Sequence, residues 1–387
     1  MAYTFSHDDI AYLASAAGAA ALAQVGDFAL TPATLLKDLE RLRRTHGDHA
    51  PALVETVRLR RRATAKLDGA QDWFFTDDAL QQATPSAVAR HRAQRLTGRA
   101  VHDVTCSIGA ELSALAETCP AVIGSDLDPV RLAMAARNLA RSRNVLLAKA
   151  DALVPCSIAD VVIADPARRA DGRRTHDPAK LQPPLPDLLS AYAGRDLAVK
   201  CAPGLDFDRL GWAGEIEVVS LDGAVREACL WSSGLAESGV TRRATVLSSA
   251  ADPWTLTDAD PDHIPEREPG EWIIDPDGAV VRAGLVRHYA AKHGLWQLDP
   301  RIAYLTGDQL PEGVRGFRVL DRMEFREKPL RAELHRRDCG PLALLARGVD
   351  IDPDALRKRL KPRGSQPHTL VVTRIGSTAT VFLCATP

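Results

Sequence analysis

Several features that mark other protein classes are missing from this chain of 387 residues. Its seven cysteines are scattered, odd in number and without a Cys-x-x-Cys pair, which argues against a disulfide framework or a zinc site and favours a reducing cytoplasm. The 49 Lys and Arg are balanced by 50 Asp and Glu, so the chain lacks the overall basic excess of a nucleic-acid coat. Asp8 and Asp9 stand where a signal peptide needs basic residues, and the Ala-rich run 10–23 is too short to span a bilayer. We therefore expect no metal and no membrane partner.

What is present predicts several folded segments, since the chain is long enough for two or three domains. Residues 1–82 predict a helical segment built from amphipathic runs such as 50–67. Residues 83–250 alternate short β-branched runs with helical runs, which is typical of an α/β fold with a mostly parallel sheet. Residues 251–309 begin rich in Asp, Pro and Glu and predict a linker or connecting region. Residues 310–387 mix apolar runs with one helical run and predict a small α+β domain.

The end of the α/β segment carries two strand-like runs, 215–222 and 244–249, with no long helical run between them. A crossover to a parallel neighbour normally uses a helix. We therefore expect these two strands to form an antiparallel pair at one edge of the sheet.

Two stretches of the chain are locally basic. Between Arg41 and Lys66 there are eight Lys and Arg against two Asp and Glu, and between Gly313 and Arg363 there are fourteen against eight. Such surfaces can bind phosphates, but a solvated helix surface has the same composition. The sequence leaves both interpretations open.

Carboxylates end four successive predicted strands of the α/β segment. They are Asp103, Asp126, Asp151 and Asp165. In an open α/β sheet, ligands bind outside the carboxyl ends of the strands. Four acids gathered there would repel one another unless a ligand supplied donors, such as ribose hydroxyls, an adenine amino group or an ammonium group. Helix capping is the alternative for any one of them.

The strings DVTCSIG, GSDLDP, ADAL and ADPAR around these acids resemble, in order, the first four motifs of the class I S-adenosylmethionine-dependent methyltransferases. The resemblance covers residues 80–250 and implies a Rossmann-like seven-stranded core with S-adenosylmethionine as cofactor. It implies that Asp126 binds the ribose and Asp151 the adenine. It also implies that Asp103 and Gly109 lie near the methionine part of the cofactor.

The cofactor site expected from this resemblance combines the motifs with the segment LQQATPSAVARHRAQRL, which is similar to one that covers the cofactor in several such enzymes. The expected cofactor-binding residues are Gln82, Thr84, Asp103, Cys106, Ser107, Gly109, Asp126, Leu127, Asp151 and Ala152. A glycine fingerprint G-x-G-x-x-G is absent, which disfavours a dinucleotide. Ser107 occupies a position where the family usually has Gly, and this is compatible with the motif if its φ is negative.

The fourth motif, DPARR, predicts what is methylated. Related enzymes that methylate exocyclic base amines often carry Asp-Pro-Pro or Asn-Pro-Pro followed by an aromatic residue. Here the acid and the first proline match, whereas the second proline and the aromatic do not. The expected catalytic residues are Asp165, Pro166 through its carbonyl, and Arg168, which could stack on a base, bind a phosphate or form an ion pair. Lys200 is also expected near the acceptor.

The C-terminal stretch 340–376 resembles the THUMP-like domain attached to a group of bacterial methyltransferases. True THUMP domains accompany RNA-modifying enzymes and bind structured RNA. The sequence therefore predicts S-adenosylmethionine-dependent methylation of an RNA base in tRNA or rRNA, at a nitrogen. Two alternatives remain: a methyltransferase for a protein or small molecule, and a catalytically inactive module that binds cofactor and RNA.

Overall fold

A computed structural model describes residues 3–167, 169–170, 173–174 and 177–386, and the side chains of 168–176 are not described. The chain divides into two compact units. One consists of Met1–Glu215 with Glu227–Ala236, and the other of Ile216–Arg226 with Glu237–Pro387. None of the helices in the described ranges is both long and apolar enough to cross a membrane.

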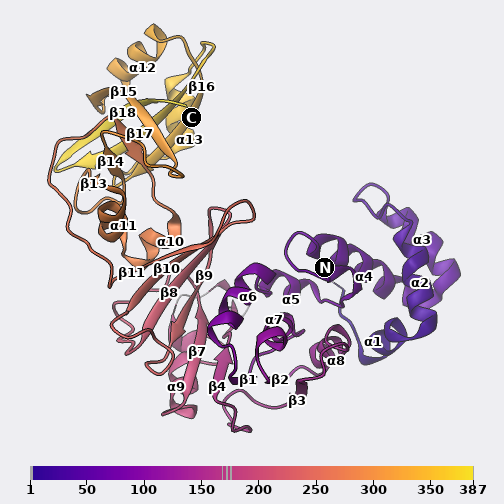
Figure 1. Cartoon of the computed structure of the whole chain (residues 1–387). Helices are drawn as coiled ribbons and strands as arrows, with labels where there is room; N and C mark the ends of the chain where they lie inside the picture. The colour runs from indigo at the N-terminus through magenta and orange to yellow at the C-terminus, as the bar shows by residue number, and fades with distance from the viewer. Residues whose placement is uncertain (1–2, 168, 171–172, 175–176, 387) are drawn as a thin grey trace. The chain divides into compact units, whose positions relative to one another are not determined.

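The first unit begins with helices, as the sequence predicts (Figure 1). These are α1 (His7–Ala14), α2 (Ala16–Gly26), α3 (Leu35–His46), α4 (Ala50–Ala63), α5 (Asp77–Gln82) and α6 (Ser86–Arg95), with short 3-10 turns at Gly47–His49 and Ala70–Asp72. Helix α4 packs against α2 and α3, and its buried Leu53 and Leu59 belong to the same apolar core as Ile108 and Met134 of the following segment. Burial of these side chains attaches the helices to the α/β core of this unit.

The basic residues between Arg41 and Lys66 divide between two environments. Arg61 on α4 donates to the carbonyls of Gly26, Phe28 and Ala29, at 2.7–2.8 Å. Lys66 just beyond α4 donates to the carbonyls of Leu80 and Gln81, at 2.9 and 3.0 Å. These cations therefore stabilise the packing of the helices, and the phosphate-binding interpretation does not extend to them.

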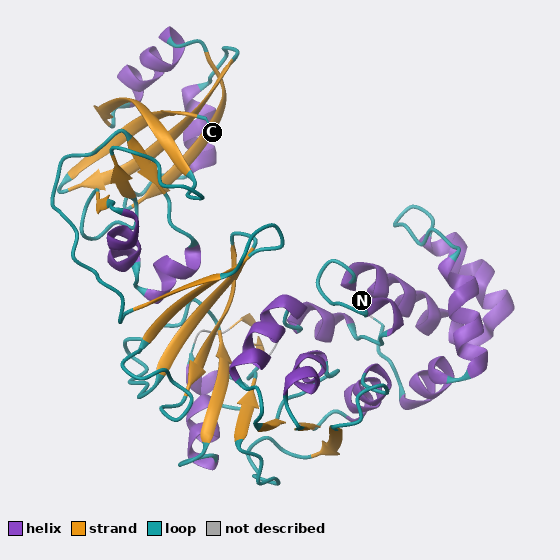
Figure 2. Cartoon of the chain, in the orientation of Figure 1, coloured by secondary structure: helices purple, strands orange, loops and turns teal. Residues whose placement is uncertain are grey.

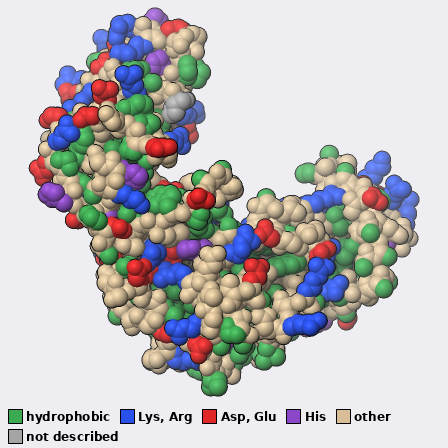
Figure 3. Space-filling view, viewed as in Figure 1, with side chains coloured by type: hydrophobic (Ala, Val, Ile, Leu, Met, Phe, Trp, Pro, Cys, Tyr) green, Lys and Arg blue, Asp and Glu red, His purple; other side chains and the backbone are tan. Residues whose placement is uncertain are grey.

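Helix α3, in contrast, carries its basic side chains on the surface. Lys37, Arg43 and Arg44 are exposed, and we find no ion pair for them within the described part of the chain. Lys and Arg side chains gather over this helix in Figure 3. Of the predicted basic stretch, α3 is thus the part available to an outside partner.

A nine-stranded sheet follows, in the order β11-β10-β8-β9-β7-β4-β1-β2-β3. Its strands are β1 (Ala100–Asp103), β2 (Ala121–Asp126), β3 (Val145–Lys149), β4 (Val161–Ala164), β7 (Asp196–Cys201), β8 (Glu215–Leu221), β9 (Ala224–Trp231), β10 (Arg242–Leu247) and β11 (Trp254–Thr257). The helices α7 (Ala110–Thr118), α8 (Pro129–Asn138) and α9 (Leu185–Ala191) alternate with its strands (Figure 2). The five strands β3, β2, β1, β4 and β7 are all parallel, so their carboxyl ends share one edge. This arrangement confirms the predicted Rossmann-like α/β core, but the sheet has nine strands where seven were predicted, because β10 and β11 extend it beyond β8.

The predicted antiparallel pair at the sheet edge is wrong. Strands β8 and β10 pair in parallel, with Ile216 opposite Arg242. The reason is β9, which lies between them in sequence and runs back along the sheet antiparallel to β7. A strand that reverses the chain lets β10 resume the direction of β8 without a helix.

The second unit contains a seven-stranded sheet of order β13-β14-β12-β15-β18-β17-β16. Its strands are β12 (Trp272–Ile274), β13 (Trp296–Gln297), β14 (Leu305–Gly307), β15 (Gly316–Glu324), β16 (Cys339–Arg347), β17 (Gln366–Ile375) and β18 (Thr378–Ala385). Its helices are α10 (Gly278–Ala283), α11 (Val286–His293), α12 (Glu327–Arg336) and α13 (Pro353–Leu360). The residues of α12 and α13 that enter the core of this sheet are Leu330, Leu334, Leu356 and Leu360. The stretch 251–309, predicted as a connecting region, supplies three strands of this sheet, β12, β13 and β14. Its Ile273, Ile274 and Leu305 are fully buried, so this stretch is part of the folded core.

Candidate active site

A cavity of about 880 Å³ lies in the first unit at the carboxyl ends of β1, β2, β3 and β4. That volume suits a ligand the size of a nucleoside cofactor. The cavity is lined by nine of the ten residues predicted to bind the cofactor: Gln82, Thr84, Asp103, Cys106, Ser107, Asp126, Leu127, Asp151 and Ala152. Asp165 and Lys200 also line it, so one cavity brings together residues from all four motifs.

Gly109 and Pro166 are not among the described residues that line the cavity. Gly109 has a φ of 84° and precedes α7, and a Cβ there would lie 2.7 Å from Cδ1 of Leu139. Glycine is therefore needed at this position for its backbone conformation and for close packing. The predicted Arg168 lies outside the described residues.

The loop between β1 and α7 has an unusual conformation at Ser107. Its φ is 50°, in the left-handed region, so the negative φ under which a serine would suit this motif is not what the loop adopts. The Asp126 carboxylate accepts a hydrogen bond from the Ser107 backbone N–H, at 2.9 Å, and another from the Asp128 N–H, at 2.8 Å. Charge-assisted bonds of this kind offset the steric cost of left-handed backbone, which is about 1 kcal/mol for a non-glycine residue.

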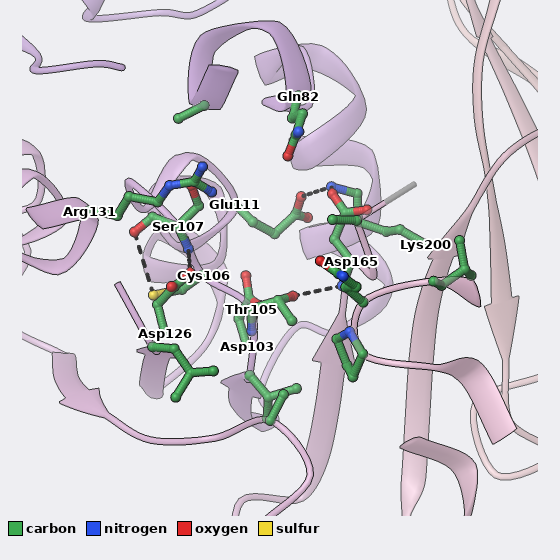
Figure 4. Close-up of a pocket in the computed structure, with 18 of the residues that line it drawn as sticks. Gln82, Asp103, Thr105, Cys106, Ser107, Glu111, Asp126, Arg131, Asp165 and Lys200 are labelled. Atoms are coloured by element: carbon green, nitrogen blue, oxygen red, sulfur yellow. Dashed lines mark hydrogen bonds and ion pairs between the residues drawn. The ribbon is translucent and has the colours of Figure 1, made fainter. Parts of the chain in front are cut away.

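Thr105 connects the first motif to the fourth. Its backbone N–H and hydroxyl both lie within hydrogen-bonding distance of Oδ1 of Asp103, at 3.0 and 3.3 Å. The same hydroxyl accepts a hydrogen bond from the backbone N–H of Asp165, at 2.7 Å. Figure 4 shows this link between the ends of β1 and β4. The acid near the predicted cofactor and the acid near the predicted acceptor are thus held in one hydrogen-bonded unit.

Asp103 is buried, and burial raises the pKa of its carboxyl to about 7. The Thr105 backbone hydrogen bond and the Lys200 charge oppose this rise, whereas the Glu111 and Asp165 charges add to it. A carboxyl with such a pKa ionises readily when a cationic group approaches it. This is the behaviour expected of a residue that receives an ammonium group.

A row of buried charges continues from Asp165 to the back of the cavity. Lys200 Nζ lies 2.6 Å from Oδ2 of Asp165 and 3.7 Å from Oε2 of Glu111. Oε1 of Glu111 contacts Arg92, at 3.3 Å, and Arg92 also pairs with Glu227. Figure 4 shows Glu111, Asp165 and Lys200 on one side of the cavity. Burial opposes the charge of Lys200, but Asp165, Glu227 and Glu111 together raise its pKa well above the ordinary lysine value, so it stays protonated.

Sequence reasoning missed Glu111, Thr105 and Arg131 in the lining of this cavity. Glu111 sits in the first turn of α7, where an acid is ordinarily explained by the helix dipole. Arg131 on α8 pairs with Asp78 of α5, at 2.9 Å, and this pairing depends on tertiary contact. The missed residues therefore left no distinctive pattern in the sequence.

The donor set fits S-adenosylmethionine. Leu127 is 60% exposed and lines the cavity together with the carboxylates of Asp126 and Asp151, which suits a flat base flanked by hydroxyl and amino donors. Asp103 and Glu111 supply buried carboxylate oxygens, and Oε2 of Glu111 has no hydrogen-bond partner within the described structure. The cavity thus offers acceptors and apolar surface to a cationic nucleoside.

Known proteins support this assignment. A protein of Mycobacterium tuberculosis strains CDC 1551 and H37Rv, named an uncharacterized S-adenosylmethionine-dependent methyltransferase, is 56% identical over 357 residues. The match covers 89% of this chain and 99% of that protein. This chain belongs to the S-adenosylmethionine-dependent methyltransferases. The methyltransferase accordingly uses S-adenosylmethionine as its cofactor, as predicted.

Two parts of the methyltransferase match family models. Residues 314–386 match the THUMP domain-like family, which confirms the predicted C-terminal THUMP-like domain, and residues 6–63 match a domain of unknown function, DUF8688. The crystal structure of a putative methyltransferase from Porphyromonas gingivalis W83 has the same fold, with a TM-score of 0.73, 20% identity and 99% of both chains covered. The helical N-terminus, the α/β core and the C-terminal domain are therefore a shared architecture.

Proposed function

We propose that this methyltransferase acts on RNA, with the acceptor atom bound beside Asp165. The observation that carries the proposal is the convergence of Asp103, Asp126 and Asp165 on one cavity, in a chain that also contains a THUMP-like domain. Asp126 would accept the ribose hydroxyls of the cofactor, Asp151 the adenine amino group, and Asp103 its ammonium group. Asp165 is left to orient the acceptor.

The THUMP-like domain supports RNA as the substrate through its surface charge. Lys328, Lys358, Lys361 and Arg363 are exposed on or beside α12 and α13, and we find no ion pair for them among the described residues. Lys and Arg side chains gather over α12 in Figure 3. Other cations of the domain are neutralised, as in the pair of Arg359 with Glu327 at 2.9 Å. Unpaired exposed cations of this kind suit contacts with phosphates.

A nitrogen of an RNA base, in tRNA or rRNA, is the acceptor favoured by the motif. The Asp165 carboxylate would accept a hydrogen bond from an exocyclic amine and point its lone pair at the methyl group. The buried Pro166, predicted as a second acceptor through its carbonyl, is not among the described residues that line the cavity. The site lies where the buried β4 ends, and Thr105 fixes the Asp165 backbone. Rigid placement of this kind is what methyl transfer requires.

A hydroxyl oxygen is the second candidate acceptor. It is favoured by the ammonium group of Lys200, 2.6 Å from Asp165, because a cation there suits an oxygen that becomes anionic.

The decisive experiment incubates the full-length protein with labelled S-adenosylmethionine and RNA fractions from a strain that lacks the gene. Incorporation of label into RNA, with the nucleoside identified by mass spectrometry, would support the proposal. Label in protein or metabolite fractions alone would show that RNA is not the substrate. If the cofactor binds but no fraction accepts label, the chain acts as a cofactor-binding module. For an active enzyme, we expect Asp165→Ala to abolish transfer while cofactor binding survives.

The compartment is also a proposal. All seven cysteines are free thiols, and six of them are buried. Free thiols persist where glutathione keeps proteins reduced. We propose that the enzyme works in the cytoplasm.

A further inference from the structure

We infer that the acceptor atom is a hydroxyl oxygen, the ribose 2′-hydroxyl of the RNA, and that Asp165 and Lys200 together activate it. The inference rests on the proposed function, since it takes RNA as the substrate. It differs from the base-nitrogen prediction, and the contacts around Asp165 decide between the two.

The first argument is the charge beside the acceptor. Lys200 Nζ lies 2.6 Å from Oδ2 of Asp165, so a group that hydrogen-bonds to this carboxylate also lies close to an ammonium. An amine that receives a methyl group becomes cationic before it loses a proton, and Lys200 would disfavour that charge. A hydroxyl that loses its proton becomes anionic, and Lys200 would stabilise it. The charge of Lys200 therefore favours oxygen over nitrogen.

The second argument is what the cavity lacks. Among the described residues that line it, none is aromatic. Enzymes that take a base out of the stack usually hold it between aromatic or apolar side chains. The described lining combines the polar Thr105 and Gln182 and the small Ala167 with aliphatic residues such as Leu181, Pro183 and Pro184, and none of these offers an aromatic face for stacking. A sugar hydroxyl needs no stacking surface.

The step balances with the groups present. The hydroxyl proton moves to the Asp165 carboxylate as the oxygen forms its bond to the methyl carbon. The carbon–sulfur bond breaks, and its electron pair stays on sulfur, which becomes a neutral thioether. Lys200 stays protonated throughout and donates a hydrogen bond to the oxygen. The one positive charge of the sulfonium is cancelled by the protonation of one carboxylate, and no further reactant is needed.

The buried row behind Lys200 explains how its ammonium is held in place. Glu111 lies 3.7 Å from Lys200 Nζ and is itself fixed by Arg92, which also pairs with Glu227. Thr84 completes the row with a hydrogen bond to Glu227, at 3.2 Å. Burying several ion pairs gives little stability to a fold, so their retention needs another reason. We assign Glu111, Arg92 and Glu227 as positioning residues for Lys200.

The position of the methyl group on the RNA tests the inference directly. RNA from a strain lacking the gene is labelled with the full-length protein and S-adenosylmethionine, and then hydrolysed in alkali. Alkali cleaves RNA through its free 2′-hydroxyls, so a 2′-O-methyl group leaves the label in resistant dinucleotides. We expect label in dinucleotides. Label in mononucleotides with a methylated base would overturn the hydroxyl acceptor but leave the RNA proposal standing. Absence of label from RNA, with label in protein or metabolites, would overturn both.

Variants of Lys200 test its role. We expect Lys200→Met to lower the single-turnover rate at saturating S-adenosylmethionine by about 100-fold, while calorimetry still detects binding of the cofactor. Lys200→Arg keeps the charge and should retain part of the rate. The matched control is Lys149→Met on β3, whose exposed side chain does not line the cavity. Equal rates for Lys200→Met and the wild type would overturn the assignment.

The positioning role of Glu111 has its own readout. Glu111→Gln keeps the size of the side chain and should lower kcat without changing KM for RNA, because the substrate does not touch it. A change in KM alone, or unchanged kinetics with lowered thermal stability, would show that Glu111 serves only the fold.

Discussion

The carboxylate of Asp126 holds the backbone of Ser107, at 2.9 Å, in a left-handed conformation that glycine would adopt more easily. The acid predicted to bind the cofactor's ribose therefore also shapes the loop beside the cofactor. Both oxygens of Asp126 accept backbone hydrogen bonds, and each can still accept another. One side chain thus links β2 to the first motif.

This relationship predicts the effect of restoring glycine. Ser107→Gly should raise the free energy of unfolding by up to about 1 kcal/mol, because the strain at φ 50° disappears. Ser107→Ala serves as the control, with the same backbone preference and no change expected. Urea unfolding of the three proteins measures the difference. A loss of stability in Ser107→Gly would mean that the backbone at this position is not strained.

Asp103 should lower the stability of the protein without its cofactor at neutral pH. Its folded pKa of about 7 lies above the ordinary aspartate value of 3.8. The stability that the protonated Asp103 contributes is therefore fully present below about pH 4 and is lost as pH rises through 7. The full difference corresponds to about 4 kcal/mol as an upper limit. Asp103→Asn should therefore gain stability over the wild type at pH 8 and much less at pH 4. Chemical unfolding at both pH values provides the measurement, and a gain independent of pH would argue against this pKa.

The affinity for S-adenosylmethionine should depend on the same group. If Asp103 receives the ammonium of the cofactor, only its ionised form binds well, and the affinity should fall about tenfold for each pH unit below 7. Calorimetry between pH 5.5 and 8, in buffers of different ionisation enthalpy, should show about one proton released per ligand below pH 7. Asp103→Asn should bind weakly with little pH dependence. An unchanged affinity in this variant would place the ammonium elsewhere.

Arg61 should stabilise the helical segment. It donates to three backbone carbonyls that follow or end α2, so Arg61→Met leaves these acceptors without their partner. We expect a loss of about 1–2 kcal/mol in the free energy of unfolding. Arg43→Met on α3 is the matched control, because Arg43 is also exposed but we find no hydrogen bond or ion pair of its side chain among the described residues, and it should unfold like the wild type. Similar losses of stability in both variants would contradict the inference that Arg61 on α4 stabilises the helix packing and Arg43 on α3 does not.

The THUMP-like domain should contribute to RNA binding through phosphate contacts. The double variant Lys358→Met and Lys361→Met should bind RNA more weakly and show a smaller dependence on salt, with the log–log slope reduced by about 1.5 if both contact phosphates. Lys149→Met, outside the domain, should keep the wild-type slope. Filter binding across salt concentrations measures the slopes. Unchanged slopes in the double variant would assign RNA binding to another surface.

Much of this enzyme follows from local pattern in the sequence. The sequence predicts the strand, turn and helix around Asp103 to Gly109 and the acids at the ends of β2 and β4. These acids are expected together because parallel strands place their carboxyl ends at one edge of the sheet. Ser107 departs from the family pattern, but the sign of its φ could not be predicted, since it depends on the hydrogen bond that the Ser107 N–H donates to Asp126. The pairing of β8 with β10 was also missed, because the strand character of β9 is set by burial of Cys229, Leu230 and Trp231.

The sequence by itself determined the alternation of strands and helices from β1 to β4, the cofactor, and the acids that line the cavity, because these depend on periodicity and on residues close together in the chain. The tertiary structure decided which charges meet. Lys200 and Asp165 are 35 residues apart, and Arg92 and Glu227 are 135 apart, so only the packing of β4, β7, β9 and α6 brings them together. Ion pairs between residues far apart in the chain produce no recognisable spacing pattern in a single sequence. The inference about the acceptor rests on these pairs.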